Sequence, residues 1–335
     1  MNNVTLGSTG IVTPQNAFGA LPVQRDDFDT AIKILQRAYE GGMTFFDTAR
    51  AYSDSEEKIG LALSDVRKKI YIATKTMAKT PDEMKEQLET SLKLLKTDYV
   101  DIYQFHCVNQ CYKPGDGTGM YECMEDFKRQ GMIKHIGITA HKIGVAEECV
   151  NSGLYETMQY PFSYLAAERE VELVNLCAKK NVGFIAMKGL AGGLITNSKA
   201  AYTFMTQFPN ALPIWGVQHM HELEEWLSFM KDSPVFNDEM KAFVEADRKN
   251  FGTDFCRGCG YCMPCPQKII INQCARMSLM IRRAPSQNWL NDYWKEEMLR
   301  TTQCIECGKC KTKCPYKLDI PNLLKKNWED YKTFI

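Results

Sequence analysis

Residues 41–52 read GGMTFFDTARAY, and this stretch decides the fold. Its two glycines follow residues 28–40, where apolar side chains recur at helical spacing, so a helix is predicted to end at the glycines. The short apolar run after them predicts a strand that ends at Asp47. A second helix is predicted over residues 55–64, so helix, strand and helix alternate around this stretch.

The alternation of strands and helices continues along the first 235 residues. After a hairpin over residues 4–12, strands are predicted at residues 15–20, 44–47, 68–75, 99–106, 133–138, 155–159, 181–187 and 212–217. Further helices are predicted at residues 81–95, 142–150, 166–179, 199–207 and 220–230. Strands that alternate with helices form a parallel sheet. This number of units favours a closed (β/α)8 TIM barrel over an open doubly wound sheet, whose glycine fingerprint is missing after the first strand.

The composition excludes several classes of protein. The chain has 335 residues, of which 44% are hydrophobic and 24% charged, as in globular proteins, so disorder and collagen-like repeats are excluded. No apolar run approaches the ~18 residues of a membrane helix. The first ten residues, MNNVTLGSTG, lack the features of a signal peptide, so we expect a cytoplasmic protein. Lys plus Arg and Asp plus Glu both number 41, which gives no reason to expect a nucleic acid or a membrane as partner.

Cysteine content and charge both change abruptly near residue 250. Of the 14 cysteines, five lie in residues 1–250 and nine in residues 251–335. The last 85 residues carry 14 Lys and Arg against 8 Asp and Glu, whereas the first 250 carry 27 against 33. These shifts predict a barrel domain over residues 1–235, a helical linker over residues 236–250 and a second domain over residues 251–335. So many cysteines without a signal peptide indicate metal ligands or reactive thiols rather than disulfides.

Four side chains that can do acid–base chemistry fall at or just after the carboxyl ends of consecutive predicted strands. Asp47, Lys75 and His106 end the second, third and fourth strands, and Tyr52 lies in the loop after Asp47. In a (β/α)8 barrel these ends form one face, where active sites lie. Each residue alone has a structural explanation, such as a helix-capping Asp or a hydrogen-bonded core His. Together the four predict a catalytic site.

The stretch GGMTFFDTARAY resembles the signature of the aldo-keto reductase family, and residues 56–60, EEKIG, resemble the start of that family's second helix. The resemblance covers residues 1–235. It implies that Tyr52 is the general acid to a carbonyl oxygen and that His106 orients the carbonyl. It further implies that Lys75, paired with Asp47, lowers the pKa of the Tyr52 phenol.

The resemblance also implies a nicotinamide cofactor, NADP(H) or NAD(H), at the same face of the barrel. Thr139 and Gln159 match carboxamide-binding positions, and Met187 stands where the family has a ring-stacking residue. The glycine-rich loop after it either cradles a pyrophosphate or is a simple turn. Residues 216–225, GVQHMHELEE, lack the Lys or Arg that the family places against the 2′-phosphate of NADP. The expected cofactor-binding residues are Gly19, Thr139, Gln159, Met187, Lys188, Gly189, Leu190, Gly216 and Val217.

Two tight cysteine runs follow residue 250. The second has the C-x2-C-x2-C-x3-C-P spacing of bacterial ferredoxins, and the first has one residue fewer before its last cysteine. In that pattern the last cysteine of each run ligates the other run's cluster. Two four-thiolate zinc sites are the alternative. The expected ligands are Cys256, Cys259, Cys262 and Cys314 for one [4Fe–4S] cluster, and Cys304, Cys307, Cys310 and Cys265 for the other.

The remaining cysteines have no such spacing and are predicted to be buried free thiols; they are Cys107, Cys111, Cys123, Cys149, Cys177 and Cys274. The spacer between the runs, residues 268–302, is predicted to be helical, with Ile270, Cys274, Met277 and Ile281 on one face. A long helical spacer resembles the α-helical ferredoxin domains of respiratory reductases. We therefore expect an α/β TIM barrel followed by a small, mainly α-helical ferredoxin-like domain.

The combined layout resembles a group of iron–sulfur aldo-keto reductases. It implies an oxidoreductase that reduces a small-molecule carbonyl or oxidises an alcohol, using a nicotinamide cofactor, electrons from two [4Fe–4S] clusters, or both. Hydride transfer moves two electrons and each cluster moves one, so either the two clusters together supply a pair of electrons, or a flavoprotein or ferredoxin partner intervenes, or the clusters are structural. The alternative function is an electron-transfer subunit whose barrel is a docking scaffold without carbonyl reductase activity.

Overall fold

The computed structural model describes residues 2–191, 193, 195–251, 256, 258, 260–282, 286–314 and 316–335. The chain forms two compact units, Met1–Asn237 and Asp238–Ile335. Among the helices in the described ranges, none is long and apolar enough to cross a membrane.

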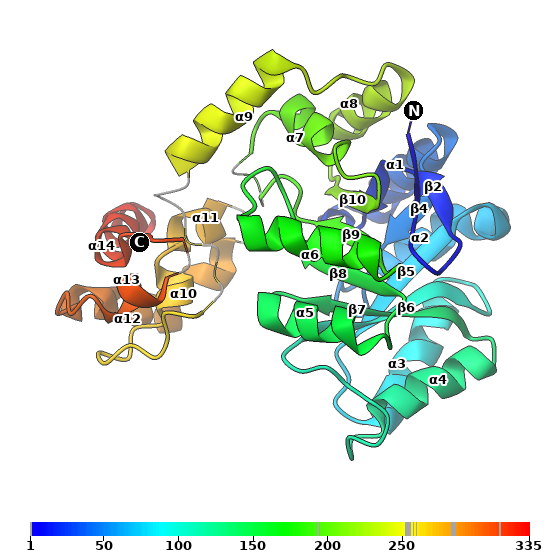
Figure 1. The fold of residues 1–335 in the computed structure, drawn as a ribbon, viewed down its shortest axis with the longest axis horizontal. Coiled ribbons are helices and arrows are strands. Elements are labelled where there is room, and N and C mark those ends of the chain that lie inside the picture. The colour runs from blue at the N-terminus through cyan, green and yellow to red at the C-terminus, as the bar shows by residue number, and fades with distance from the viewer. Residues whose placement is uncertain are drawn as a thin grey trace. The chain divides into compact units, whose positions relative to one another are not determined.

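The first unit is a closed barrel of parallel strands (Figure 1). A short antiparallel hairpin, β1 (Asn3–Thr5) and β2 (Val12–Pro14), precedes it and confirms the predicted hairpin. Each barrel strand pairs with the next in the chain, and the last pairs with the first, which confirms the predicted (β/α)8 TIM barrel. The barrel strands are β3 (Ala17–Gly19), β4 (Phe45–Asp47), β5 (Tyr71–Thr76), β6 (Val100–Val108), β7 (Ile133–Ala140), β8 (Thr157–Pro161), β9 (Gly183–Met187) and β10 (Ala211–Gly216).

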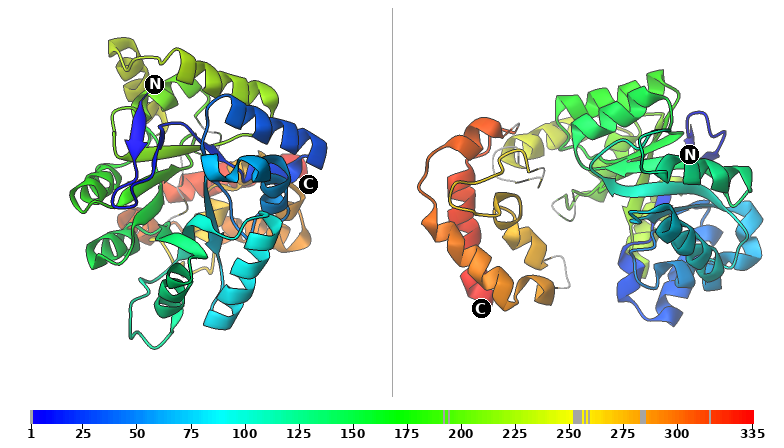
Figure 2. Two further views of the ribbon diagram at one scale, coloured as in Figure 1. Left: turned by 90° about the vertical axis from the view of Figure 1, so that its right-hand side faces the viewer. Right: turned by 90° about the horizontal axis from the view of Figure 1, so that it is seen from below.

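Helices connect the strands and surround the barrel (Figure 2). α1 begins behind Asp27 and α3 behind Thr80; each side chain accepts a hydrogen bond from a backbone N–H of the first turn, which caps the helix. The sequence pattern did not indicate α4, which connects β6 to β7. The helices of this unit are α1 (Phe28–Glu40), α2 (Ser55–Leu63), α3 (Pro81–Leu94), α4 (Met120–Arg129), α5 (Ile143–Ser152), α6 (Glu168–Lys179), α7 (Ser198–Met205) and α8 (Met220–Lys231).

Apolar side chains fill the barrel from its amino-terminal end. The hairpin residues Val4 and Leu6 pack in one buried cluster with residues that point inward from the strands, namely Ala17, Phe45, Ala73, Ile102, Ile185 and Leu212. Because this end is filled by the core, polar side chains at the opposite, carboxyl end of the strands are the ones available for chemistry.

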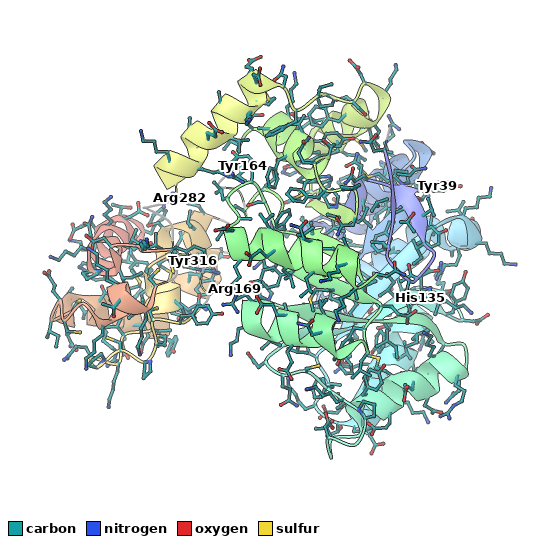
Figure 3. All side chains as sticks on the ribbon, viewed as in Figure 1. Tyr39, His135, Tyr164, Arg169, Arg282 and Tyr316 are labelled. Atoms are coloured by element: carbon teal, nitrogen blue, oxygen red, sulfur yellow. The ribbon has the colours of Figure 1, made fainter. Side chains whose placement is uncertain are left out.

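The second unit is mainly α-helical, as predicted. Its helices pack around a buried cluster that includes Met298 and Leu324. In that unit Arg282, which is labelled in Figure 3, donates a 2.7 Å hydrogen bond to Asp330, and this bond joins α11 to α14. The helices are α9 (Asp238–Phe251), α10 (Ile271–Cys274), α11 (Met277–Arg282), α12 (Asp292–Arg300), α13 (Lys309–Lys313) and α14 (Ile320–Tyr331).

The predicted continuous helix through residues 270–281 is wrong, because the helix is interrupted between the end of α10 at Cys274 and the start of α11 at Met277. Asn327 of α14 satisfies backbone groups at the break: its Oδ1 accepts a 2.8 Å hydrogen bond from the N–H of Ser278, and its Nδ2 donates a 3.1 Å bond to the carbonyl of Ala275. The predicted apolar face nevertheless forms part of the core, since Cys274 and Met277 are both fully buried.

Candidate functional site

The carboxyl ends of β4 and β5 place a buried ion pair at the mouth of the barrel. Nζ of Lys75 lies 2.6 Å from Oδ1 of Asp47 and donates a second hydrogen bond, also 2.6 Å long, to the carbonyl of Thr48. Asp47 and Lys75 are only 2% and 1% exposed. Burial raises the pKa of Asp47 and lowers the pKa of Lys75, and the charge of each residue opposes the shift of the other.

Two glutamine amides complete the surroundings of the Asp47 carboxylate. Nε2 of Gln104 lies 3.5 Å from Oδ2 of Asp47, and Nε2 of Gln159 lies 3.4 Å from its Oδ1. Gln104 also donates a 2.9 Å hydrogen bond to Oε1 of Gln159. Gln104 was not among the predicted site residues, although it lies two residues before His106 and so on the same face of β6. The amide of Gln159 is engaged inside the protein at both ends.

Tyr52 and His106 lie beside this ion pair. Their rings meet edge to face, with centroids 5.8 Å apart and planes at 80°. Nζ of Lys75 lies 5.3 Å from the centroid of the Tyr52 ring. The structure therefore brings together the four residues singled out at the strand ends, and their catalytic roles stay a prediction.

The protonation of Tyr52 differs from the expectation. Burial, with the negative charges of Asp47 and Cys107 adding to its effect, raises the pKa of Tyr52 above its ordinary value. The net shift is opposite to the expected lowering, because burial outweighs the effect of the Lys75 ammonium, whose charge Asp47 partly offsets from 2.6 Å. Burial, reinforced by the charge of Lys75, lowers the pKa of His106 to about 3. At neutral pH Tyr52 is protonated and His106 is uncharged.

A buried carboxylate fastens the loop that carries Tyr52. Glu56, in the first turn of α2, is fully buried, forms an ion pair with Arg50 and accepts a 2.6 Å hydrogen bond from Oγ1 of Thr74. Arg50 also donates a 3.1 Å hydrogen bond to the carbonyl of Ser53. Because Arg50 and Ser53 flank Tyr52 in the chain, these bonds set the position of the phenol. Neither Arg50 nor Glu56 was predicted as a site residue.

In the second unit, predicted cluster ligands line one cavity. Cys265, Cys304, Cys307 and Cys310 surround it, and this is the ligand set expected for the cluster of the second run. Cys262, expected to ligate the other cluster, also lines the cavity. Thiolates are the usual ligands of iron–sulfur clusters, so the donor set fits such a group.

The first cysteine run is more deeply buried. Cys256 and Cys262 are buried and Cys265 is partly buried, whereas Cys259 lies outside the described residues. Cys314, the ligand that the second run is expected to add to this cluster, is partly buried. Gly258 adopts a left-handed φ of 72°, a conformation that favours glycine. In the part of the chain that the structure describes, no three His, Cys, Asp or Glu side chains converge closely enough to hold a single metal ion.

Residues 15–233, more than half of the chain, match the family model described as Aldo/keto reductase family. The chain belongs to the aldo/keto reductase family. Residues 255–319 match the model of a 4Fe-4S dicluster domain. An oxidoreductase of Bacillus subtilis described as uncharacterized, YqkF, is 29% identical over 210 residues, which are 58% of this chain and 67% of that protein.

Solved structures of aldo-keto reductases share the barrel of this family member. One from Bacillus halodurans has a TM-score of 0.64 at 20% sequence identity, covering 73% of this chain and 96% of its own. One from Klebsiella pneumoniae, in complex with NADPH, has a TM-score of 0.64 at 18% identity, covering 74% and 95%. These likenesses show the fold. Family membership makes the protein an oxidoreductase, and a 4Fe-4S dicluster domain follows its aldo/keto reductase barrel.

In this aldo/keto reductase the predicted nicotinamide-binding residues lie at or just after the carboxyl ends of β3 and of β7 to β10. Oγ1 of Thr139 already accepts a 2.6 Å hydrogen bond from the N–H of Cys107. Nζ of Lys188 lies 3.1 Å from Nε2 of His141. Gly189 has no room for a side chain, because an added Cβ would lie 2.5 Å from the ring of Trp215.

The acidic residues after β10 are held within the aldo/keto reductase barrel. Glu222 accepts hydrogen bonds of 2.8 and 2.9 Å from the N–H groups of Gln218 and His219, so its carboxylate caps the start of α8. Glu224 forms a two-point ion pair with Arg37, at 2.7 and 2.9 Å. A basic side chain also reaches this segment from elsewhere in the chain, since Arg25 donates a 3.4 Å hydrogen bond to Gln218.

Most of the remaining cysteines are buried, but Cys107 is exposed, so that prediction is wrong for this residue. β6 is irregular between Phe105 and Val108, and Cys107 adopts a left-handed φ of 54° there. Cys123 is partly buried, and the buried thiols are Cys111, Cys149, Cys177 and Cys274.

Proposed function

We propose that this aldo/keto reductase reduces the carbonyl group of a small molecule, or oxidises the corresponding alcohol. The observation that carries the proposal is the buried Asp47–Lys75 ion pair with Tyr52 and His106 beside it. A protonated phenol and a neutral imidazole can both donate hydrogen bonds to one carbonyl oxygen. This supports a reaction in which negative charge develops on that oxygen.

In the proposed reaction Tyr52 donates its proton to the carbonyl oxygen while His106 holds that oxygen in place. A nicotinamide, when bound, supplies the hydride. The raised pKa of Tyr52 keeps the proton on the phenol until charge develops on the substrate. The Lys75 ammonium, 5.3 Å from the centre of the phenol ring, stabilises the phenolate left by proton transfer.

We propose that the nicotinamide, NADP(H) or NAD(H), is held along the carboxyl ends of β3 and β7 to β10. The missing side chains of Gly19, Gly189 and Gly216 make room for Trp215 and Pro22, so what supports the proposal is the position of the candidate residues at one end of the barrel. Gln159 fits only by exchanging its present partners, Asp47 and Gln104, for the carboxamide. The residues proposed to hold the cofactor are Gly19, Thr139, Gln159, Met187, Lys188, Gly189, Leu190, Gly216 and Val217.

We propose that residues 251–335 hold two [4Fe–4S] clusters and that residues 236–250 link them to a barrel domain of residues 1–235. The match to a dicluster domain and the thiol-lined cavity support two clusters. Each cluster carries one electron at a time, so the two clusters together hold as many electrons as one hydride. The proposed ligands are Cys256, Cys259, Cys262 and Cys314 for one cluster, and Cys265, Cys304, Cys307 and Cys310 for the other.

A second candidate function is an electron-transfer subunit whose barrel is only a scaffold. The observation that favours it is the engagement of Thr139 and Gln159 in hydrogen bonds within the protein. The two functions differ in whether the pure protein turns over a carbonyl.

The experiment that tests the proposed function uses the full chain, purified without oxygen. A panel of aldehydes and ketones is offered with NADPH and NADH, and nicotinamide oxidation is followed together with the alcohol formed. We expect one alcohol per nicotinamide oxidised. Nucleotide binding or cluster reduction without any alcohol, across the panel and in both directions, would support the scaffold function instead.

A further inference from the structure

The two cysteine runs differ in their access to solvent. In the first run Cys256 and Cys262 are buried and Cys265 is partly buried. In the second run Cys310 is buried, Cys304 and Cys314 are partly buried, and Cys307 is exposed. Ile305, two residues before Cys307, is 61% exposed. A cluster held by the second run therefore lies nearer to the surface. Because electron transfer between proteins weakens steeply with distance, the second run is the better point for electrons to enter.

The surface of the second run is also basic. Four lysines between residues 304 and 317 are exposed, and none of them forms an ion pair with any residue that the structure describes. The single acidic residue of this segment, Glu306, is already paired with Lys325. The first run, residues 256–265, has one basic residue and no acidic one. The basic residues of the segment are Lys309, Lys311, Lys313 and Lys317.

We propose that residues 304–317, here called the lysine face, are the docking surface for an acidic ferredoxin, a small electron-carrier protein rich in Asp and Glu. The proposal rests on the proposed clusters. An exposed apolar side chain, Ile305, with charges around it is the pattern of a protein interface, and opposite charges steer such partners together. Interfaces of redox pairs are small, so a segment of this size is sufficient.

Each docking event transfers one electron. The reduced ferredoxin is oxidised by one electron, and the cluster beside Cys307 passes from [4Fe–4S]2+ to [4Fe–4S]1+. Two successive dockings deliver two electrons, the number that one hydride carries. Nucleic acids and anionic membranes also attract lysines, but neither explains why these lysines fall in the same short segment as the exposed Cys307. A carrier protein explains both the charge and its position.

The test compares charge reversals on and off the lysine face. In the full-length protein with its clusters, Lys311→Glu/Lys313→Glu changes the lysine face, and Lys241→Glu/Lys249→Glu on α9 makes the same change in net charge elsewhere. Binding of a purified acidic ferredoxin is measured by calorimetry, and its one-electron oxidation by stopped-flow absorbance. We expect the first variant to raise the Kd at least about tenfold and the control less than about threefold. Added salt should weaken wild-type binding.

Iron content and bleaching by dithionite establish that both variants keep their clusters. Equal effects of the two variants, or no binding of ferredoxin to the wild-type protein, would overturn the docking proposal. So would lysine-dependent binding of DNA or of anionic vesicles with ferredoxin binding unchanged. Carbonyl reduction by NADPH is assayed on the same samples, so failure of the proposed function is seen separately: ferredoxin could dock and reduce the cluster while no alcohol forms.

Discussion

At the scale of single residues, the phenol oxygen of Tyr52 is the atom that gives up a proton in the proposed reaction. Tyr52→Phe removes this oxygen and leaves the ring in place. We expect the variant to lower kcat for carbonyl reduction by roughly 10²–10⁴-fold, the usual contribution of general acid catalysis. The Kd for the nucleotide should change little, because the phenol acts in the transition state. Wild-type turnover by the variant in steady-state kinetics would mean that another group supplies the proton.

The lowered pKa of His106 makes a second prediction, on stability. The folded protein protonates His106 near pH 3, whereas the unfolded chain protonates it near the ordinary value of 6.5. Between these values the unfolded state binds more protons, so this histidine makes the free energy of unfolding fall as the pH falls, by up to ~1.4 kcal/mol per pH unit. His106→Gln should remove this slope. Denaturant unfolding of both proteins from pH 6.5 to pH 4 measures it, and parallel curves would contradict the assignment.

The residues that meet at the mouth of the barrel could be predicted from the sequence, but their protonation states could not. Asp47 and Lys75 each come at the end of a recognisable strand, and parallel strands of a barrel end on one face. The pKa of Tyr52, in contrast, depends on how closely Asp47 offsets the charge of Lys75 and on how much water reaches the phenol. Neither of these quantities can be inferred from the spacing of residues in the sequence.

At the scale of elements, the loop between β4 and α2 depends on one buried carboxylate. Glu56→Gln keeps the size of the side chain but leaves Arg50 without its counter-charge. We expect a loss of about 2–4 kcal/mol in the free energy of unfolding and a lower kcat/KM, because the loop positions Tyr52. Glu57→Gln is the matched control, since Glu57 is exposed and surface changes cost at most about 0.5 kcal/mol. Chemical denaturation of both variants compares the two losses, and equal losses would contradict this role.

The start of α8 makes a prediction about the choice of nucleotide. The carboxylate of Glu222 already occupies the backbone N–H groups there, and like charge repels a 2′-phosphate. We therefore expect NADPH to bind no more than about tenfold more tightly than NADH, a margin of ~1.4 kcal/mol. Titration with each nucleotide, followed by tryptophan fluorescence, measures the ratio. A hundredfold preference that disappears in Arg25→Ala would instead show that Arg25 turns from Gln218 to the phosphate.

Element prediction succeeded where local signals and packing agree. α1 runs over the predicted residues 28–40, between the Asp27 cap and the glycines. α4 was not predicted, although Met120, Met124 and Phe127 recur at helical spacing. It follows a long loop and has no capping side chain to mark its start. The break between α10 and α11 could not be predicted, since its cause is Asn327, about fifty residues further along the chain.

At the scale of the whole molecule, the proposed clusters fix a stoichiometry. Protein purified without oxygen should contain about eight irons and about eight sulfides per chain, with a brown absorption that dithionite bleaches. Cys307→Ser should lose about half of the iron, whereas Cys107→Ser should lose none, although both thiols are exposed. Elemental analysis gives the counts. Stoichiometric zinc without sulfide would contradict the cluster assignment.

The presence of a second, cysteine-rich domain after residue 250 could be predicted, because the amino-acid composition changes there. Nine of the 14 cysteines and an excess of basic residues fall after residue 250. Whether a given thiol is exposed to solvent could not be predicted from the sequence, because exposure depends on local backbone geometry. Cys107 and Cys149 look alike in the sequence, yet the irregularity of β6 exposes the first and α5 buries the second.

The contact between Gly189 and Trp215 has a consequence for how this protein can evolve. The Trp215 ring cannot move aside for a methyl group at position 189, because it is stacked on Trp226 with 4.1 Å between ring centroids and planes 9° apart. A substitution at position 189 is therefore tolerated only with a smaller residue at position 215. Position 189 follows β9, position 215 lies in β10 and position 226 lies in α8, so three separate elements should vary together across lineages. In a random mutant library of this chain, substitutions at position 189 should be recovered mainly as double mutants.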